Sequence, residues 1–243
     1  MFPLKDDNPT EKKPYVTIAI ITICILIFLY QTSLSINENN IFVYSYGLKP
    51  NSLFFNNLII DNTINPLVTI FTSMFLHGSI FHLLGNMLFL WIYGNNIEDS
   101  MGHIKFLLFY IVCGVAAAFL QSFITPNSEI PMIGASGAVS GVLSAYFLLF
   151  PRAKVSTLIV LFIFITIIRV PAGILIAFWF LSQLTNAYIS NPNTPGVAWY
   201  AHIGGFIMGA FLIPFLKEKK FKFFSRGRKP SAKKNSIRLR FRK

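Results

Sequence analysis

The chain has 243 residues, of which 54% are hydrophobic and only 12% are charged. Soluble domains carry roughly 25% charged residues, about twice this share. The composition therefore argues against a soluble cytosolic enzyme, a disordered chain and a disulfide-rich scaffold, and it indicates a polytopic membrane protein.

The net charge of +12 is confined to one end of the chain. Residues 217–243 hold 13 of the 21 Lys and Arg residues and one of the nine acidic residues, so residues 1–216 are net neutral. A basic segment of this kind could bind nucleic acid or the anionic headgroups of lipids. Because it lacks a recognisable nucleic-acid-binding fold and follows an apolar segment, we expect membrane lipids as its partner and no nucleic acid.

Six apolar segments are expected to cross a membrane as helices. They cover residues 15–35, 80–97, 105–123, 134–149, 171–188 and 201–216. A seventh apolar stretch, Val155–Ile168, has only 14 residues. As a helix it would reach about 21 Å, short of a hydrocarbon core of about 30 Å. We interpret it as an interfacial or re-entrant piece, and the expected fold is an all-α polytopic membrane protein with six spans.

Six spans place both termini on the same side of the membrane. The opposite, outer side then has a single basic residue, Lys49, in its segments 36–79, 124–133 and 189–200. Loops rich in Lys and Arg stay in the cytoplasm. We therefore expect a multi-pass protein, in a bacterial plasma membrane, with both termini cytoplasmic.

The first outer segment, residues 36–79, is long for a loop. It contains two apolar runs, Leu53–Phe55 and Leu67–Phe71. Such runs favour a loop that is partly embedded in the membrane surface.

The polar residues within the spans gather at one depth. The second, fourth and sixth segments all run inward from the outer side. Their first turns contain His82 and Asn86, then Ser136, then His202. Ionisable groups inside a membrane are costly and usually face a cavity or a partner, so this coincidence indicates a functional site.

Ser136 lies in the string Gly134-Ala135-Ser136-Gly137, at the start of the short fourth segment. About 16 residues make a helix of roughly 24 Å, so a helix anchored at the inner surface would begin below the outer one. Ser136 would then lie at a helix N-terminus, where free amides can stabilise an oxyanion. The alternative role for this string is close helix packing through small residues.

His202 precedes Gly205 and Gly209, and the fourth segment carries Gly137 and Gly141 at the same spacing. Two such faces allow two helix backbones to approach closely. Their contact would bring His202 within hydrogen-bond reach of the serine that begins the fourth segment.

His82 and Asn86 lie four residues apart, on one face of the second segment. Both side chains can donate hydrogen bonds, which suits the stabilisation of an oxyanion. Polar contact between helices is the alternative role.

The nine acidic residues all lie in loops or tails. A hydrolase built from this chain would therefore use a Ser-His dyad and not a buried triad. Metal chemistry is disfavoured because the four histidines form no metal-binding motif. We expect neither a metal nor a cofactor.

Together these elements resemble the rhomboid family of intramembrane serine proteases. The resemblance covers roughly residues 15–216. Its motifs are His77-Gly78 with His82 and Asn86, Gly94–Gly102, Gly134–Gly137, Pro151–Ala153, and Ala201-His202 with Gly205 and Gly209.

The resemblance implies a rhomboid-like bundle of six transmembrane helices that cleaves single-pass transmembrane proteins in or near their spanning segments. It implies that Ser136 is the nucleophile and His202 the general base. The amide of Ser136 would form the oxyanion hole with His82 and Asn86. Residues with an implied structural role near the site are His77, Gly134, Gly137, Trp199, Gly205 and Gly209.

Two further features concern the surroundings of His202. The fifth helix and the cap 189–200, with Trp199, would gate access from the membrane. Some family members carry an aromatic residue four positions after the nucleophile, where it stacks on the catalytic histidine. Ser140 occupies that position here, so a hydrogen bond from Ser140 to His202 is an alternative.

The expected organisation is a cytoplasmic N-terminal segment at 1–14, a rhomboid protease domain at 15–216 and a basic cytoplasmic tail at 217–243. A non-catalytic rhomboid-like protein that binds transmembrane helices is the main alternative, but such proteins usually lack the serine or the histidine. A transporter is a third reading, which would need a polar path across the bilayer.

Overall fold

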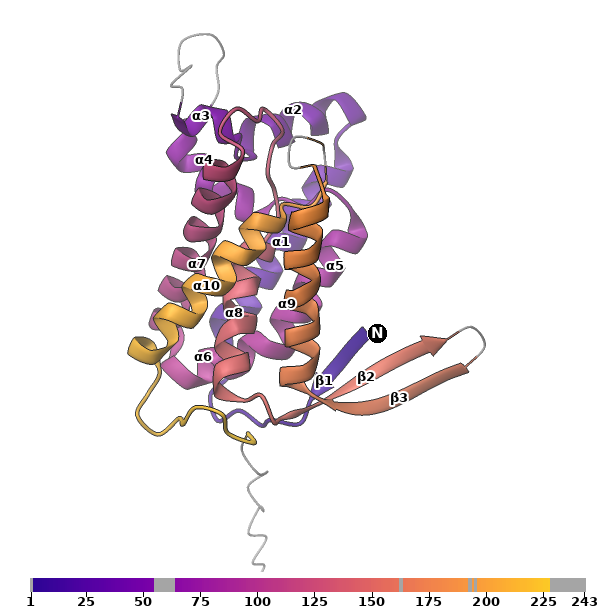
Figure 1. The fold of residues 1–243 in the computed structure, drawn as a ribbon. Coiled ribbons are helices and arrows are strands. Elements are labelled where there is room, and N and C mark those ends of the chain that lie inside the picture. The colour runs from indigo at the N-terminus through magenta and orange to yellow at the C-terminus, as the bar shows by residue number, and fades with distance from the viewer. Residues whose placement is uncertain (1, 55–63, 162–163, 192–193, 195, 228–243) are drawn as a thin grey trace, which may run out of the picture.

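The computed structural model describes residues 2–54, 64–161, 164–191, 194 and 196–227. The helices form a bundle, and a small β-sheet lies at one end of it (Figure 1). Residues 55–63 of the first outer segment and residues 228–243 of the expected basic tail lie outside the described part of the chain.

All six expected spans are helical. Within the described residues, four helices are long and apolar enough to cross a membrane, a fifth candidate is a pair bent by 83°, and the Ser136 helix is a shorter apolar one. The multi-pass helical membrane fold is therefore confirmed. The helices of the bundle are α1 (Tyr15–Ser33), α5 (Ile80–Phe89) continued by a π-helical turn (Leu90–Gly94) and α6 (Asn95–Met101), α7 (His103–Ile124), α8 (Ser136–Leu149), α9 (Ala172–Ile189) and α10 (Trp199–Leu216).

The first outer segment folds into short helices at the end of the bundle remote from the sheet (Figure 1). They are α2 (Ile36–Tyr46), α3 (Pro50–Phe54), α4 (Pro66–Thr72) and a 3-10 turn (Ser73–Phe75). Ser35 and Glu38 form a capping box at the start of α2. The apolar side chains of Ile36, Leu67 and Phe71 are exposed, as expected for a loop that lies partly in the membrane surface.

The sequence analysis did not predict the three-stranded antiparallel sheet, which departs from the expected all-α fold. Its strands are β1 (Phe2–Asp6), β2 (Lys154–Leu161) and β3 (Phe164–Pro171), in the order β1-β2-β3. The re-entrant interpretation of 155–168 is thus corrected, because this segment forms a hairpin that projects sideways from the bundle end (Figure 1). Nine of its 14 residues are β-branched, and such residues favour strands.

The segments before α1 and after α10 meet at the same end of the bundle. Lys12 forms an ion pair with Glu218, and Lys220 Nζ lies 3.2 Å from a carboxylate oxygen of Glu11. The amide of Glu218 also donates to the carbonyl of Ser100, at 2.8 Å. Both flanking segments therefore lie on one side, as an even number of spans requires.

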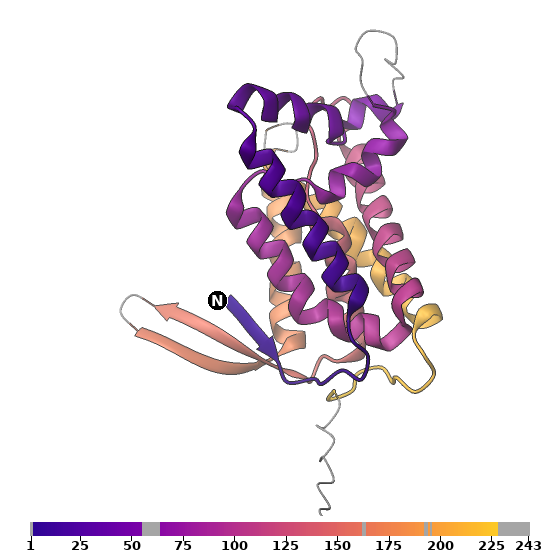
Figure 2. The same cartoon turned by 180° about the vertical axis from the view of Figure 1, so that it is seen from behind.

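Glu98 fixes the start of α1 against this end of the bundle. Its buried carboxylate accepts hydrogen bonds from the amides of Val16 and Thr17, at 2.9 and 2.8 Å, and from the Thr17 hydroxyl at 2.7 Å. The residue before α1 is Pro14, whose side chain provides no cap. The first amides of a helix have no hydrogen-bond partner within it. The Glu98 carboxylate of α6 therefore accepts from these amides of α1, and its negative charge complements the helix dipole. In Figure 2, α1 (indigo) runs along the face of the bundle that is turned toward the viewer.

Small residues let α10 lie directly against α7 and α8. A Cβ atom at Gly205 would overlap the carbonyl of Gly137, and one at Gly209 would overlap the carbonyl of Gly141. A Cβ atom at Gly137 would in turn lie 2.5 Å from the Ala117 methyl of α7. The expected glycine faces therefore meet, and the backbones of α8 and α10 are in contact.

We expect Gly205→Ala to lower the free energy of unfolding by about 1–3 kcal/mol, because the added methyl group must push the two backbones apart. Thermal unfolding in detergent micelles measures the loss. Gly85→Ala is the matched control, since no heavy atom lies within 4 Å of a Cβ built there and the helical propensity of alanine should stabilise α5 slightly. Equal melting temperatures for Gly205→Ala and the wild type would contradict the packing argument.

Candidate active site

The loop before α8 brings Ser136 into the interior of the bundle. Gly134 has φ = +121°, a backbone conformation that is essentially restricted to glycine. Its amide donates to the carbonyl of Ser73 at 2.9 Å, and Met132 pairs with Leu48 of the first outer segment. These contacts fix the loop, so that α8 begins at Ser136 with Ala135 as its N-cap residue.

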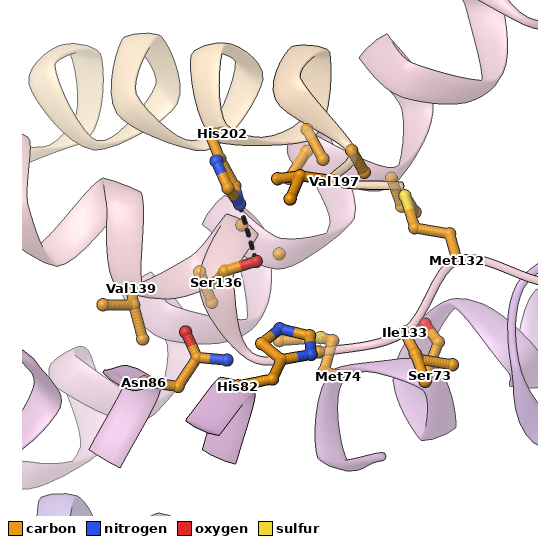
Figure 3. Close-up of a pocket in the computed structure, with 18 of the residues that line it drawn as sticks. Ser73, Met74, His82, Asn86, Met132, Ile133, Ser136, Val139, Val197 and His202 are labelled. Carbon is orange, nitrogen blue, oxygen red and sulfur yellow. Dashed lines mark hydrogen bonds between the residues drawn. The ribbon is translucent and has the colours of Figure 1, made fainter. Parts of the chain in front are cut away.

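Ser136 and His202 form the centre of the site. The hydroxyl oxygen of Ser136 lies 2.8 Å from Nε2 of His202 (Figure 3). His202 is in the first turn of α10 and is 7% exposed. The two side chains are 66 residues apart in sequence, and the contact between α8 and α10 brings them together. This arrangement suits proton transfer from the hydroxyl to the imidazole.

Gln183 of α9 is a partner of His202 that the sequence analysis missed. Its side-chain oxygen lies 2.8 Å from Nδ1 of His202, and the residue is 4% exposed. The search for a partner considered only the acidic residues. The available signal was a group of polar residues in the second half of α9, Ser182, Gln183, Thr185 and Asn186, because polar residues inside a membrane usually face a partner.

Two tryptophans surround the His202 ring. The Trp179 ring of α9 lies 5.8 Å away at 35°, and the Trp199 ring lies 6.1 Å away, edge to face. The Ser140 hydroxyl donates to the carbonyl of Ser136 at 2.6 Å. The alternative hydrogen bond from Ser140 to His202 is therefore not formed, and Trp179 provides the tilted aromatic neighbour from another helix.

His82 and Asn86 lie on α5, on the opposite side of Ser136 from His202 (Figure 3). Ser79 caps this helix by accepting a hydrogen bond from the amide of His82, at 3.2 Å. The Asn86 side chain is buried, and its amide nitrogen has no hydrogen-bond partner among the described residues. A buried donor without a partner is costly, so this nitrogen is available to a ligand in the cavity.

His77 is buried and lies next to His82. The two rings are in edge-to-face contact, with centroids 5.1 Å apart. The His77 backbone is held by Gln31 of α1, whose side chain accepts from the amide and donates to the carbonyl, at 3.1 and 3.3 Å. This contact joins α1 to the start of α5.

A cavity of about 740 Å³ contains the site. His82, Asn86, Ser136 and His202 all line it, and apolar side chains make up much of the remaining wall, including Phe81, Phe89, Met132, Ile133, Val139 and Val197. The cavity therefore offers a polar centre in apolar surroundings, as expected for a site that takes an apolar ligand. In the described ranges, no cluster of three or more His, Cys, Asp or Glu residues could hold a metal ion.

Comparison with known proteins identifies the family. The model of the Rhomboid domain matches residues 65–219. The chain belongs to the rhomboid family. It is 33% identical over 146 residues to Rhomboid protein 1, mitochondrial, of Saccharomyces cerevisiae, and 31% identical over 133 residues to the Rhomboid protease GluP of Bacillus subtilis.

The similarity covers a part of each relative. The two alignments span 58% and 55% of this chain, but 40% of the yeast protein and 24% of the Bacillus protein. RHOMBOID-like protein 1 of Arabidopsis thaliana is 30% identical over 169 residues, which is 66% of this chain and 38% of the plant protein. The chain therefore matches two fifths or less of the length of each of these rhomboid proteins.

We expect Gly134→Ala to disturb the site more than the fold as a whole. The positive φ would strain an alanine by about 1–3 kcal/mol, and its Cβ atom would lie 2.7 Å from the His82 ring. Labelling of Ser136 by a serine-directed fluorophosphonate should fall, while membrane insertion stays normal. Wild-type labelling by the alanine variant would show that the position does not need glycine.

Proposed function

We propose that this rhomboid-family chain is an intramembrane serine endopeptidase that cleaves transmembrane segments of membrane proteins through an acyl-enzyme. The observation that carries the proposal is the 2.8 Å contact between the Ser136 hydroxyl and His202 Nε2, at a helix N-terminus inside an apolar bundle. A hydroxyl held against an imidazole is the arrangement that serine nucleophiles use.

The reaction begins when the Ser136 oxygen attacks the carbonyl carbon of the scissile peptide bond and His202 Nε2 takes the hydroxyl proton. The tetrahedral intermediate collapses with cleavage of the C–N bond, and His202 returns the proton to the leaving amine. Water then attacks the acyl-enzyme and gives its proton to His202. The second tetrahedral intermediate collapses with cleavage of the bond between the acyl carbon and the Ser136 oxygen. His202 returns the proton to that oxygen, which regenerates the hydroxyl and releases the product with a new C-terminal carboxyl group.

The oxyanion of the tetrahedral intermediate needs donors on the side of Ser136 that faces α5. The proposed donors are the amide of Ser136, the unpartnered amide nitrogen of Asn86, and the ring of His82. The first amides of α8 have no partner within their own helix, and the helix dipole favours negative charge there. Each donor acts on the charge that develops only during the reaction.

The surroundings of the site support the proposed substrate class. Apolar cavity walls and a membrane bundle suit a spanning segment of a single-pass protein. The proposed domain spans residues 15–216, between a cytoplasmic segment at 1–14 and a basic tail at 217–243 that contacts anionic headgroups. Both termini then face the cytoplasm of a bacterial cell, and the site opens toward the outside.

We expect Ser136→Ala and His202→Ala to abolish cleavage of a model transmembrane substrate in proteoliposomes while both variants still insert. The alanine at 136 removes the attacking oxygen, and the alanine at 202 removes its base. Product formation is measured on gels. Unimpaired cleavage by Ser136→Ala would contradict the protease proposal. Substrate binding without cleavage by the wild type would favour a non-catalytic binder.

We expect Asn86→Ala to lower kcat by about 10²-fold with little change in KM, because the donor acts mainly on the transition state. His82→Ala should also slow the reaction. Thr185→Val is the control, since this residue is exposed and its hydroxyl donates to the carbonyl of Leu181 within its own helix, at 3.0 Å. A wild-type kcat for Asn86→Ala would remove Asn86 from the oxyanion hole.

A further inference from the structure

Gln183 contacts His202 on the side away from Ser136. The residue lies in the second half of α9 and is one of its few buried side chains. Its oxygen is 2.8 Å from Nδ1 of His202, while the other ring nitrogen is 2.8 Å from the Ser136 hydroxyl. The imidazole therefore stands between two polar groups that come from two different helices.

The orientation of the Gln183 amide is fixed by its own helix. Its nitrogen donates to the carbonyl of Trp179 at 2.9 Å and to the hydroxyl of Ser182 at 2.8 Å. The Ser182 hydroxyl donates its proton to the same Trp179 carbonyl, at 2.6 Å, so it is free to accept. A rotated amide would place its oxygen against a carbonyl oxygen, which is repulsive. The oxygen of Gln183 therefore faces His202.

This orientation decides the tautomer of His202. An amide oxygen only accepts hydrogen bonds, so Nδ1 of the neutral imidazole must carry the proton. Nε2 is then left with its lone pair, directed at the Ser136 hydroxyl. This is the tautomer that a base needs in order to take the serine proton.

We propose that Gln183 is a positioning residue that holds His202 as the Nδ1–H tautomer, so that the site is a Ser-His-Gln arrangement with a neutral third member. The inference rests on the proposed protease function for its kinetic consequence, but the tautomer itself does not depend on catalysis. A neutral orienting group fits the location, because a carboxylate inside a membrane bundle is costly.

The other groups around His202 do not replace Gln183. Trp179 and Trp199 contact the ring through their aromatic faces and edges, and the side chain of Gln121 on α7 accepts from the amide of Ala201 at 3.2 Å. His82 of α5 is a further titratable residue that lines the same cavity. Among the described residues, the ring forms side-chain hydrogen bonds with Ser136 and Gln183.

The kinetic test compares Gln183→Met with Gln183→Glu. Methionine has a similar size and no oxygen, so we expect kcat to fall by about 10- to 100-fold with KM unchanged, because the tautomer and the ring orientation are no longer fixed. Glutamate restores an acceptor and should recover most of kcat at pH 8. It should also move the acidic limb of the pH–rate profile to higher pH, because a carboxylate stabilises the imidazolium.

Asn186→Leu is the matched control. It removes an amide from the same helix, and that amide donates to the carbonyl of Ser182 at 2.8 Å. We expect its kcat to stay within about twofold of the wild type. The proposal is overturned if Gln183→Met keeps the same kcat as this control. It is equally overturned if the Met and Glu variants lose activity to the same extent while both insert and melt like the wild type.

A spectroscopic measurement separates this inference from the protease proposal. In wild-type protein labelled with ¹⁵N-histidine, the ring nitrogen shifts of His202 should report the Nδ1–H tautomer, whether or not the protein cleaves a substrate. The opposite tautomer would overturn the role of Gln183 even if cleavage is robust. Absence of cleavage together with the Nδ1–H tautomer would overturn the protease proposal and leave the positioning role of Gln183 supported.

Discussion

The contact between the glycine faces of α8 and α10 is the constraint on which the rest of the site depends. Gly205 lies so close to Gly137 that a side chain at either position would collide with a neighbour. Lipid offers no hydrophobic driving force between helices, so close backbone packing must hold the pair together. This approach places the first turn of α10 beside the start of α8, and the 2.8 Å contact between Ser136 and His202 follows from it.

The same packing explains how polar groups persist inside an apolar bundle. The Ser136 hydroxyl and the Gln183 oxygen each form a hydrogen bond with one ring nitrogen of His202. The Gln183 nitrogen donates to the carbonyl of Trp179 in its own helix. Polar groups without partners are costly in such surroundings. The amide nitrogen of Asn86 is an exception within the described residues, and it lines the cavity that also contains the serine. In the proposed mechanism, this nitrogen is one of the donors that stabilise the oxyanion.

Much of the fold could be predicted because membrane spans are set by length and hydrophobicity. The six expected segments match six helical regions to within a few residues. The hairpin at 155–168 was missed because the segment was judged by the length that it would have as a helix. Its many β-branched residues favour strands instead. Gln183 was missed because only acidic residues were expected as partners of His202, and glutamine is uncharged. Its separation of 19 residues from His202 also matches no motif.

The sequence by itself indicated the multi-pass membrane class, the positions of six helical segments, and the placement of Ser136 and His202 at the starts of two of them. These features depend on local composition, periodicity and charge, which need no tertiary contact. Only the tertiary structure decided which nitrogen of His202 faces the serine, which aromatic ring lies beside it, and where the orienting amide comes from. Those outcomes depend on the rotation and separation of α8, α9 and α10, and hydrogen-bond geometry changes with shifts of less than an ångström.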